Sequence, residues 1–139
     1  MRFFLDSNVL VSGTAFSGTE HWILQATFRG EHTFVISENV RREALMVMRQ
    51  KFPRLRDEAE EALSVLRVEV VPAKAYAERA GGFPELRDPK DAHVLAAAIV
   101  SRCDVIVTGD KDLLALGEVE GVRIMRPSHA RQLMGGSPQ

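Results

Sequence analysis

Four acidic residues stand where their carboxylates could meet and do chemistry. Asp6 closes a short apolar run at the start of the chain, and Asp110 follows another apolar run near its end. Asp91 stands in the first turn of an expected helix, and Glu43 stands past Ser37, roughly 9 Å along another helix. Because no His or Cys belongs to this set, its ligand atoms are all oxygen, which favours Mg²⁺ or Mn²⁺. Such a site binds phosphate oxygens and can generate a hydroxide nucleophile, which indicates phosphodiester hydrolysis.

Each acid also has a simpler structural interpretation. Asp6 could end a strand in an Asx turn, Asp110 could cap a helix, and Asp91 could favour a helix dipole. Glu43 could be a solvated residue on a helix. The chemical interpretation gains weight because all four acids are expected at one edge of the fold. Clustered carboxylates repel one another, so a bound cation is needed to hold them together.

The elements that position these acids alternate between short apolar strands and amphipathic helices. Strands are expected over 3–5, 33–36, 68–71, 105–108 and 122–125, and helices over 21–29, 38–51, 56–66, 73–80, 89–100, 112–116 and 127–134. Residues 9–11 are expected to form only a turn of helix before a loop marked by Gly13 and Gly18, and Ser17 begins a capping box. This order predicts an α/β fold with one mostly parallel sheet of about five strands and helices on both faces. Asp6 and Asp110 then lie together at the carboxyl edge of that sheet, where sites form.

Length and composition are those of an ordinary globular protein. The 139 residues fit one domain, expected over residues 1–134 with a mobile tail at 135–139. The net charge of −1 provides no global basic field, so nucleic-acid binding would depend on a local basic face. The single Cys103 excludes an intrachain disulfide and favours the cytoplasm. Neither a signal peptide nor a membrane span is expected.

Four segments resemble the motifs of PIN domains. They are the segment from Leu5 to Val11, the segment from Ser37 to Glu43, the segment from Asp88 to Ala98, and the segment from Val107 to Leu114. The resemblance covers nearly the whole chain, in the order and spacing of the family. Within it the chain is most similar to prokaryotic toxin components of toxin–antitoxin systems, like the VapC ribonucleases.

The resemblance implies a Mg²⁺- or Mn²⁺-dependent endoribonuclease whose RNA products carry 5′-phosphate and 3′-hydroxyl ends. It implies that Asp6, Asp91 and Asp110 hold metal. Glu43 would hold metal or its water, and Asp112 would be an auxiliary acid in the metal site. A homodimer and a cognate antitoxin protein are the partners that the family leads us to expect.

A basic run follows the second motif. Its functional interpretation is a surface that tracks the RNA backbone through Arg41, Arg42 and Arg49. The simpler interpretation is a solvated face with ion pairs to nearby acids. His93, two residues after Asp91, is interpreted as a structural residue.

Other functional classes fit the residues less well. A phosphatase of the haloacid dehalogenase type needs a second Asp two residues after the first, but that position is Asn8, which could not protonate a leaving group well. A non-catalytic binding module on the same fold stays open, because fold does not fix function. A nucleotide-binding domain is disfavoured, since no glycine-rich fingerprint follows the first strand.

Overall fold

The computed structural model describes residues 1–83 and 86–136 and confirms a single α/β domain architecture. Its strands are β1 (Arg2–Leu5), β2 (Thr33–Ser37), β3 (Glu69–Val71), β4 (Val105–Val107), β5 (Glu118–Val119) and β6 (Val122–Met125). Its helices are α1 (Ser7–Ala15), α2 (Thr19–Ala26), α3 (Glu38–Lys51), α4 (Arg56–Val65), α5 (Ala73–Ala80), α6 (Pro89–Val100), α7 (Lys111–Leu116) and α8 (Pro127–Leu133), with a short 3₁₀ turn η1 (Pro53–Leu55).

The sheet has the strand order β3-β2-β1-β4-β6-β5. All neighbouring pairs are parallel except β5 with β6, which confirms the expected mostly parallel sheet. Strand β5 was not expected, because two residues between a glycine and a turn carry no periodic signal. The chain runs outward from β1 to β2 and β3, then returns to place β4 on the other side of β1. The sheet therefore has its topological switch point between β1 and β4.

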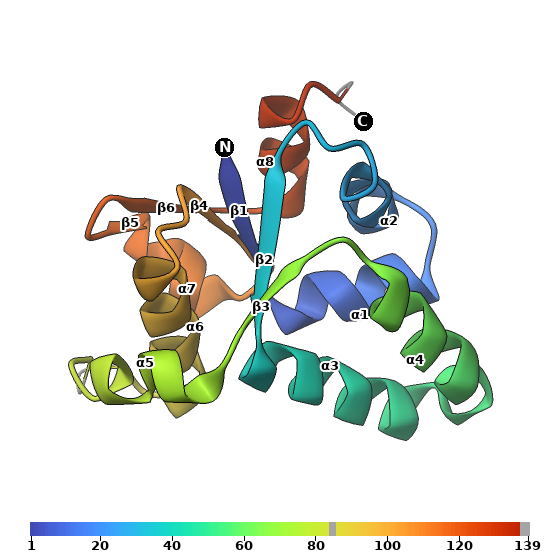
Figure 1. The fold of residues 1–139 in the computed structure, drawn as a ribbon, viewed down its shortest axis with the longest axis horizontal. Helices are drawn as coiled ribbons and strands as arrows, with labels where there is room; N and C mark the ends of the chain where they lie inside the picture. The colour runs from blue at the N-terminus through green and yellow to red at the C-terminus, as the bar shows by residue number, and fades with distance from the viewer. Residues whose placement is uncertain (84–85, 137–139) are drawn as a thin grey trace.

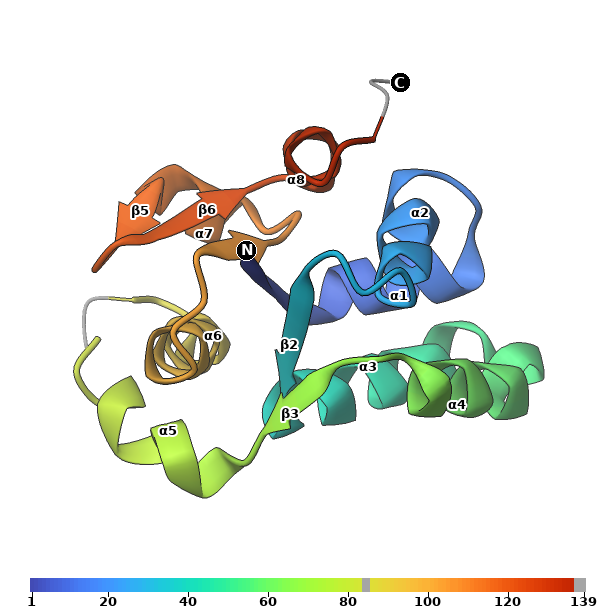
Figure 2. The same cartoon turned by 45° about the horizontal axis from the view of Figure 1, so that its top comes forward.

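Helices cover both faces of this sheet, as Figures 1 and 2 show. Helices α1 to α4 pack together on one side, where α8 joins them by packing on α2, while α5 and α6 pack together on the other side. The central strands are buried on both faces, so β1 and β4 consist of apolar side chains with no exposed surface beyond Arg2. This double burial explains why both strands read as continuous apolar runs and not as alternating ones.

The N-terminal part of the chain differs from the sequence-based expectation. Helix α1 continues through Gly13 to Ala15 instead of ending in a loop. A Cβ on Gly13 would lie 2.6 Å from Leu24 Cδ1 and 2.9 Å from the Glu20 carbonyl oxygen, so the glycine lets α2 pack closely on α1. The capping box at Ser17 is also wrong: Gly18, with φ +133°, occupies the N-cap of α2 and offers no side chain.

The remaining segments follow the expected plan. Ser37 caps α3 by accepting a hydrogen bond from Val40 N at 3.0 Å, and Asp88 caps α6 with Pro89 at the first helical position. Of the expected tail, Gly135 and Gly136 hydrogen-bond back to α8, and residues 137–139 lie outside the described part of the chain. Within the described residues, every helix is too short or too polar to cross a bilayer.

Candidate metal centre

The switch point of the sheet brings the first and fourth motifs into contact. Leu5 is in register with Val107, and the amide of Asp6 donates to the Val107 carbonyl at 3.1 Å. Both strands therefore end side by side, and the chain after each strand turns into a helix. In open parallel sheets this crevice is where ligands bind.

Asp6 is held at this point by three hydrogen bonds. Its Oδ2 accepts from Thr108 Oγ1 at 2.7 Å and from Asn8 Nδ2 at 3.1 Å, while its Oδ1 accepts from the amide of Ser7 at 2.8 Å. The residue is only 6% exposed. Burial raises the pKa of Asp6, the hydrogen bonds from Thr108 and Ser7 oppose that rise, and nearby negative charge adds to it. A bound cation would favour the ionised form of this carboxylate.

Asp110, Asp91 and Asp112 bring their carboxylates together. Each offers an oxygen within 4.8 Å of the others. Asp110 Oδ1 caps α7 by accepting from the amides of Asp112 and Leu113, so the capping role considered from the sequence is real. Asp91 lies in the first turn of α6, so the start of that helix faces the start of α7. The structure thus supports a cation site without excluding the capping interactions.

The environment of this cluster disfavours the ionised form of Asp91. The residue is 6% exposed. Burial is the largest cause that raises the pKa of Asp91 to about 6, and the negative charge of Asp110 is the next. Asp88, Asp6 and Asp112 act in the same direction. Mutual repulsion of this kind is the state that a divalent cation would relieve.

Glu43 completes one cleft with three of the other acids. The cleft has a volume of about 320 Å³. Asp6, Glu43, Asp91 and Asp110 all line it. Glu43 is half-buried on α3, and its Oε1 lies 3.4 Å from Lys90 Nζ. Asp112 does not line the cleft but is exposed beside Asp91 and Asp110, and it pairs with Arg87 Nη2 at 3.0 Å.

The donor set fits a hard divalent cation. All candidate ligand atoms are carboxylate oxygens, and they come from four different elements of the fold. Mg²⁺ and Mn²⁺ are bound by oxygen ligands of this kind, whereas sites for zinc or copper usually include His or Cys. Asp91, Asp110 and Asp112 are placed to hold such an ion, with Asp6 and Glu43 beside them.

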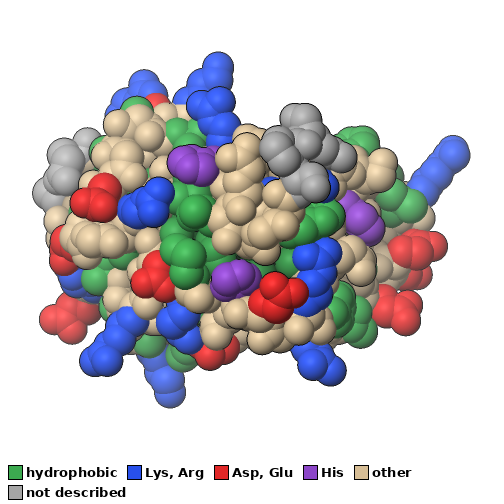
Figure 3. Space-filling model, turned by 90° about the horizontal axis from the view of Figure 1, so that it is seen from above, with side chains coloured by type: hydrophobic (Ala, Val, Ile, Leu, Met, Phe, Trp, Pro, Cys, Tyr) green, Lys and Arg blue, Asp and Glu red, His purple; other side chains and the backbone are tan. Residues whose placement is uncertain are grey.

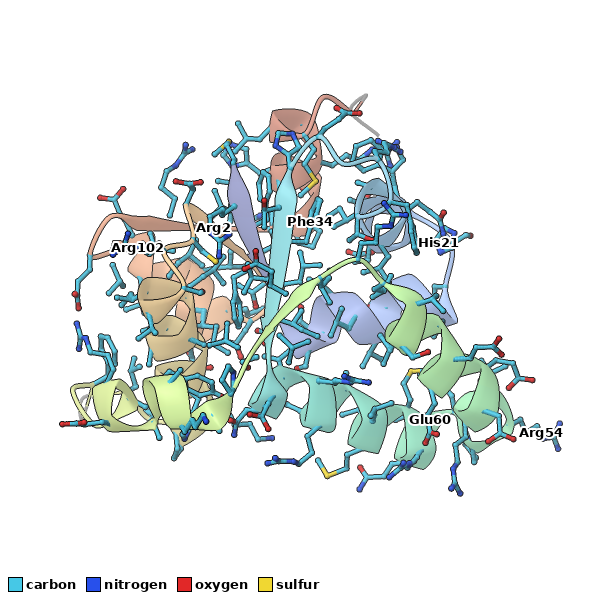
Figure 4. The ribbon with its side chains drawn as sticks, in the orientation of Figure 1. Arg2, His21, Phe34, Arg54, Glu60 and Arg102 are labelled. Carbon is cyan, nitrogen blue, oxygen red and sulfur yellow. The ribbon has the colours of Figure 1, made fainter. Side chains whose placement is uncertain are left out.

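The predicted RNA-binding arginines do not all lie beside the acids. Arg42 borders an apolar cavity next to the acid cleft, together with Glu43 and Lys90. Arg41 and Arg49 instead line the groove between α3 and α4. There Arg49 Nη2 pairs with Glu60 Oε1 at 2.6 Å, and Figure 4 shows Glu60 on α4 beside α3. Their role in RNA binding stays a prediction.

The structure adds several residues to the site for which the sequence analysis assigned no role there. Thr108 joins Asp6 to the fourth motif, and the Asn8 side chain links Asp6 to Gly109 N, which donates to Asn8 Oδ1 at 2.9 Å. Lys51 and Lys90 are the basic side chains that line the acid cleft. The sequence offered one signal for the role of Thr108, because a polar residue stands there between a buried strand and the motif acid Asp110.

The motifs and the fold agree with one known family. A family model described as PIN domain matches residues 2–112 of the chain. The chain belongs to the PIN domain family. No curated protein sequence is similar enough to count as a match.

Solved structures share the fold of this PIN domain at low sequence identity. A toxin–antitoxin complex from Klebsiella pneumoniae has a TM-score of 0.68 at 20% identity, covering 89% of this chain and 96% of that one. VapBC2 from Rickettsia felis, bound to a DNA fragment from its promoter, has a TM-score of 0.65 at 14% identity, covering 91% and 98%. VapC20 from Mycobacterium tuberculosis, a toxin that cleaves the sarcin–ricin loop, has a TM-score of 0.65 at 21% identity, covering 87% and 98%. The family named from the sequence motifs is therefore confirmed, with toxin–antitoxin proteins among its structural neighbours.

Proposed function

We propose that this PIN domain is a Mg²⁺- or Mn²⁺-dependent endoribonuclease. The observation that carries the proposal is the meeting of carboxylate oxygens from Asp91, Asp110 and Asp112 within 4.8 Å. The cluster stands at the switch point of the sheet, beside the buried Asp6 and the half-buried Glu43. A divalent ion bound there would supply a Lewis acid for phosphate oxygens and lower the pKa of a water molecule to make it a nucleophile.

The protein's own residues would position the reactants. Asp6 is fixed by Thr108, Asn8 and Ser7, so its carboxylate keeps one orientation at the floor of the cleft. Glu43 faces the cleft from α3 and could hold metal or orient the attacking water. Lys51 and Lys90 line the cleft as cations that could contact the phosphate backbone of a single strand.

The phosphatase alternative is further weakened by Asn8. Its Nδ2 donates to Asp6 and its Oδ1 accepts from Gly109 N, so the side chain bridges the first and fourth motifs. An amide in this position cannot act as the acid that a leaving group requires. A non-catalytic binding module stays the second candidate, because the fold alone does not decide between binding and cleavage.

The biological setting that we propose is a toxin–antitoxin system, with an antitoxin protein as partner and a homodimer as the assembly. The fold similarity to toxin–antitoxin complexes from Klebsiella pneumoniae and Rickettsia felis supports this setting. The RNA-cleaving activity of the Mycobacterium tuberculosis neighbour supports RNA as the substrate class.

The test is a cleavage assay on a labelled single-stranded RNA with Mg²⁺, with Mn²⁺ and with EDTA. We expect cleavage with either metal, none in EDTA, and products with 5′-phosphate and 3′-hydroxyl ends. Hydrolysis of a generic phosphomonoester without RNA cleavage would favour the phosphatase. Metal binding with neither activity would favour the binding module.

A further inference from the structure

An apolar slot adjoins the acid cleft between α3 and α6. Its walls are Val40 and Met46 from α3 and Val94 from α6, with the ring of His93 between them. The slot and the acid cleft share Glu43, Lys90 and Val94, so they form one continuous depression along the two helices. An occupant of the slot would lie directly beside the carboxylates.

The slot has the size of one planar ring. Its volume is about 150 Å³. A cavity of roughly 150 Å³ accommodates benzene in a protein core. Its apolar walls would cover the two faces of such a ring, and its partly open mouth lies at Met46.

Two polar groups in the slot are suited to the edge of a heterocycle. His93 Nδ1 is buried and has no hydrogen-bond partner among residues 1–83 and 86–136. Nδ1 itself has almost no accessible surface, so it would reach a ligand in the slot only through a small rotation of the ring, which would relieve the cost of its missing partner. The Asn39 carbonyl oxygen accepts from the hydroxyl of Tyr76, which leaves the amide nitrogen as a donor. Tyr76 also packs edge-on against His93, which fixes both residues.

Positive charge stands at the rim. Arg42 lines the slot, and Lys90 stands on the boundary between slot and cleft. An apolar slot for a ring, bordered by cations and opening onto a phosphate-cleaving site, matches the chemistry of a nucleotide within a single strand. Proteins that recognise single-stranded RNA hold splayed bases in this way, by stacking and by hydrogen bonds to base edges.

We infer that the slot is a base-binding subsite for the nucleotide next to the scissile phosphate, and this inference rests on the proposed function. His93 and Asn39 would contact the base edge, Val40, Met46 and Val94 its faces, and Arg42 the adjoining phosphate. His93 would thus determine specificity in addition to its structural contact with Tyr76. A second copy of the chain covering the slot is the competing occupant, which sedimentation distinguishes.

The first arm of the test measures cleavage of short RNAs that carry a normal or an abasic nucleotide on either side of the cut. For the wild type we expect one abasic position to lower kcat/KM by at least about fivefold, the lower end of what a stacked base contributes. Met46→Trp should fill the mouth of the slot with its indole and so remove most of this difference between normal and abasic RNAs. Because Met46 is 45% exposed, the fold can accommodate the larger side chain. Gln50→Trp, one turn further along α3 and outside the slot, should behave like the wild type.

The second arm does not need cleavage. In EDTA, the imidazole NMR signals of His93 should shift when the intact oligoribonucleotide is added and stay in place with the abasic one. The subsite is refuted and the proposed function stands if RNA is cut, the abasic RNAs are cut as fast as the normal one, and the His93 signals do not shift. If the base shifts His93 without any cleavage, the proposed function fails, and the slot is instead a base-binding site of a non-catalytic module.

Sedimentation of the same variants tests the competing occupant. We expect Met46→Trp and Gln50→Trp to sediment as the wild type does. If Met46→Trp alone dissociates an oligomer, a second copy covers the slot and the inference is overturned. An absence of both cleavage and His93 shifts would overturn the inference and the proposed function together.

Discussion

Thr108 Oγ1 donates to Asp6 Oδ2 at 2.7 Å, which joins the ends of β1 and β4 across 102 positions of the chain. The same oxygen accepts from Asp110 N at 3.0 Å and from Asn8 Nδ2 at 3.3 Å. One hydroxyl therefore fixes both motif acids that flank the switch point. Because Thr108 is fully buried, water cannot replace these bonds.

We expect Thr108→Val to destabilise the protein although the side-chain volume hardly changes. The substitution takes the partner from the Asp110 amide and removes one of the two hydrogen bonds to Asp6 Oδ2, which costs about 1–3 kcal/mol of unfolding free energy. Urea denaturation measures the loss, and Thr108→Ser, which keeps the hydroxyl, should recover most of it. Equal stability of Thr108→Val and the wild type would mean that this network does not hold the site.

The raised pKa of Asp91 predicts the pH dependence of the metal-free protein. Its folded pKa of about 6 lies above the usual 3.8, so the folded state binds the proton more tightly than the unfolded state does. The free energy of unfolding should therefore fall as pH rises from about 4 to 6, and stay low above that, with an upper limit of about 3 kcal/mol from this residue. Asp91→Asn should remove this fall.

The measurement is the difference in unfolding free energy between the wild type and Asp91→Asn, followed from pH 4 to pH 7 in EDTA. Other carboxylates titrate in both proteins, so the difference isolates Asp91. As pH rises across this range, the unfolding free energy of Asp91→Asn should increase relative to that of the wild type. A difference that does not change with pH would show that Asp91 is not strained by its neighbours.

Metal binding should reverse the order of stability. A hundredfold excess of Mn²⁺ over its dissociation constant should stabilise the wild type by about 2.7 kcal/mol. Asp91→Asn should gain much less, because an amide is a poor ligand for a hard cation and lowers the charge of the site. Thermal melting across a Mn²⁺ titration follows both proteins. An equal rise in the two melting temperatures would remove Asp91 from the ligand set.

The basic run can be tested by the salt dependence of RNA binding. Each phosphate contact that is lost should reduce the log–log salt slope by about 0.7 for a single strand. Arg42→Ala should show this reduction, since Arg42 lies beside the acid cleft. The double variant Arg41→Ala, Arg49→Ala tests the groove between α3 and α4, where Arg49 already pairs with Glu60. Unchanged salt slopes in both variants would mean that these arginines form a solvated face and do not contact RNA.

The surface supports a local basis for RNA binding and not a global one. On the face seen in Figure 3, the positive and negative side chains are interspersed around a partly hydrophobic centre. The formal net charge is −1. Any affinity for a polyanion would then come from cations at the cleft, where Lys51 and Lys90 line the wall beside the acids.

The sequence predicted the elements that local patterns determine. The buried strands β1 and β4 stood out as apolar runs, and a parallel sheet then required Asp6 and Asp110 to meet at one edge. The start of α6 followed from Asp88 and Pro89. These features depend on neighbours in the chain or on a general rule of sheet topology.

Features that depend on distant contacts could not be predicted in this way. Gly13 reads as a loop residue, but it lies within α1 because α2 packs against it. The bond from Thr108 to Asp6 and the pair of Arg87 with Asp112 join parts of the chain whose proximity only the fold creates. The slot between α3 and α6 likewise arises from the packing of two helices, so it could not be predicted from the order of its residues.

The central claim is that the clustered carboxylates make this PIN domain a metal-dependent ribonuclease. The most direct measurement is the rate of cleavage of one labelled single-stranded RNA in Mn²⁺ by the wild type, Asp91→Asn and Asp57→Asn. Asp57 is exposed on α4, so its variant is a matched control that also loses one carboxylate away from the cleft. The account predicts equal cleavage by the wild type and Asp57→Asn, none by Asp91→Asn, and none by any of the three in EDTA. Cleavage by Asp91→Asn at the wild-type rate, or cleavage that persists in EDTA, would contradict it.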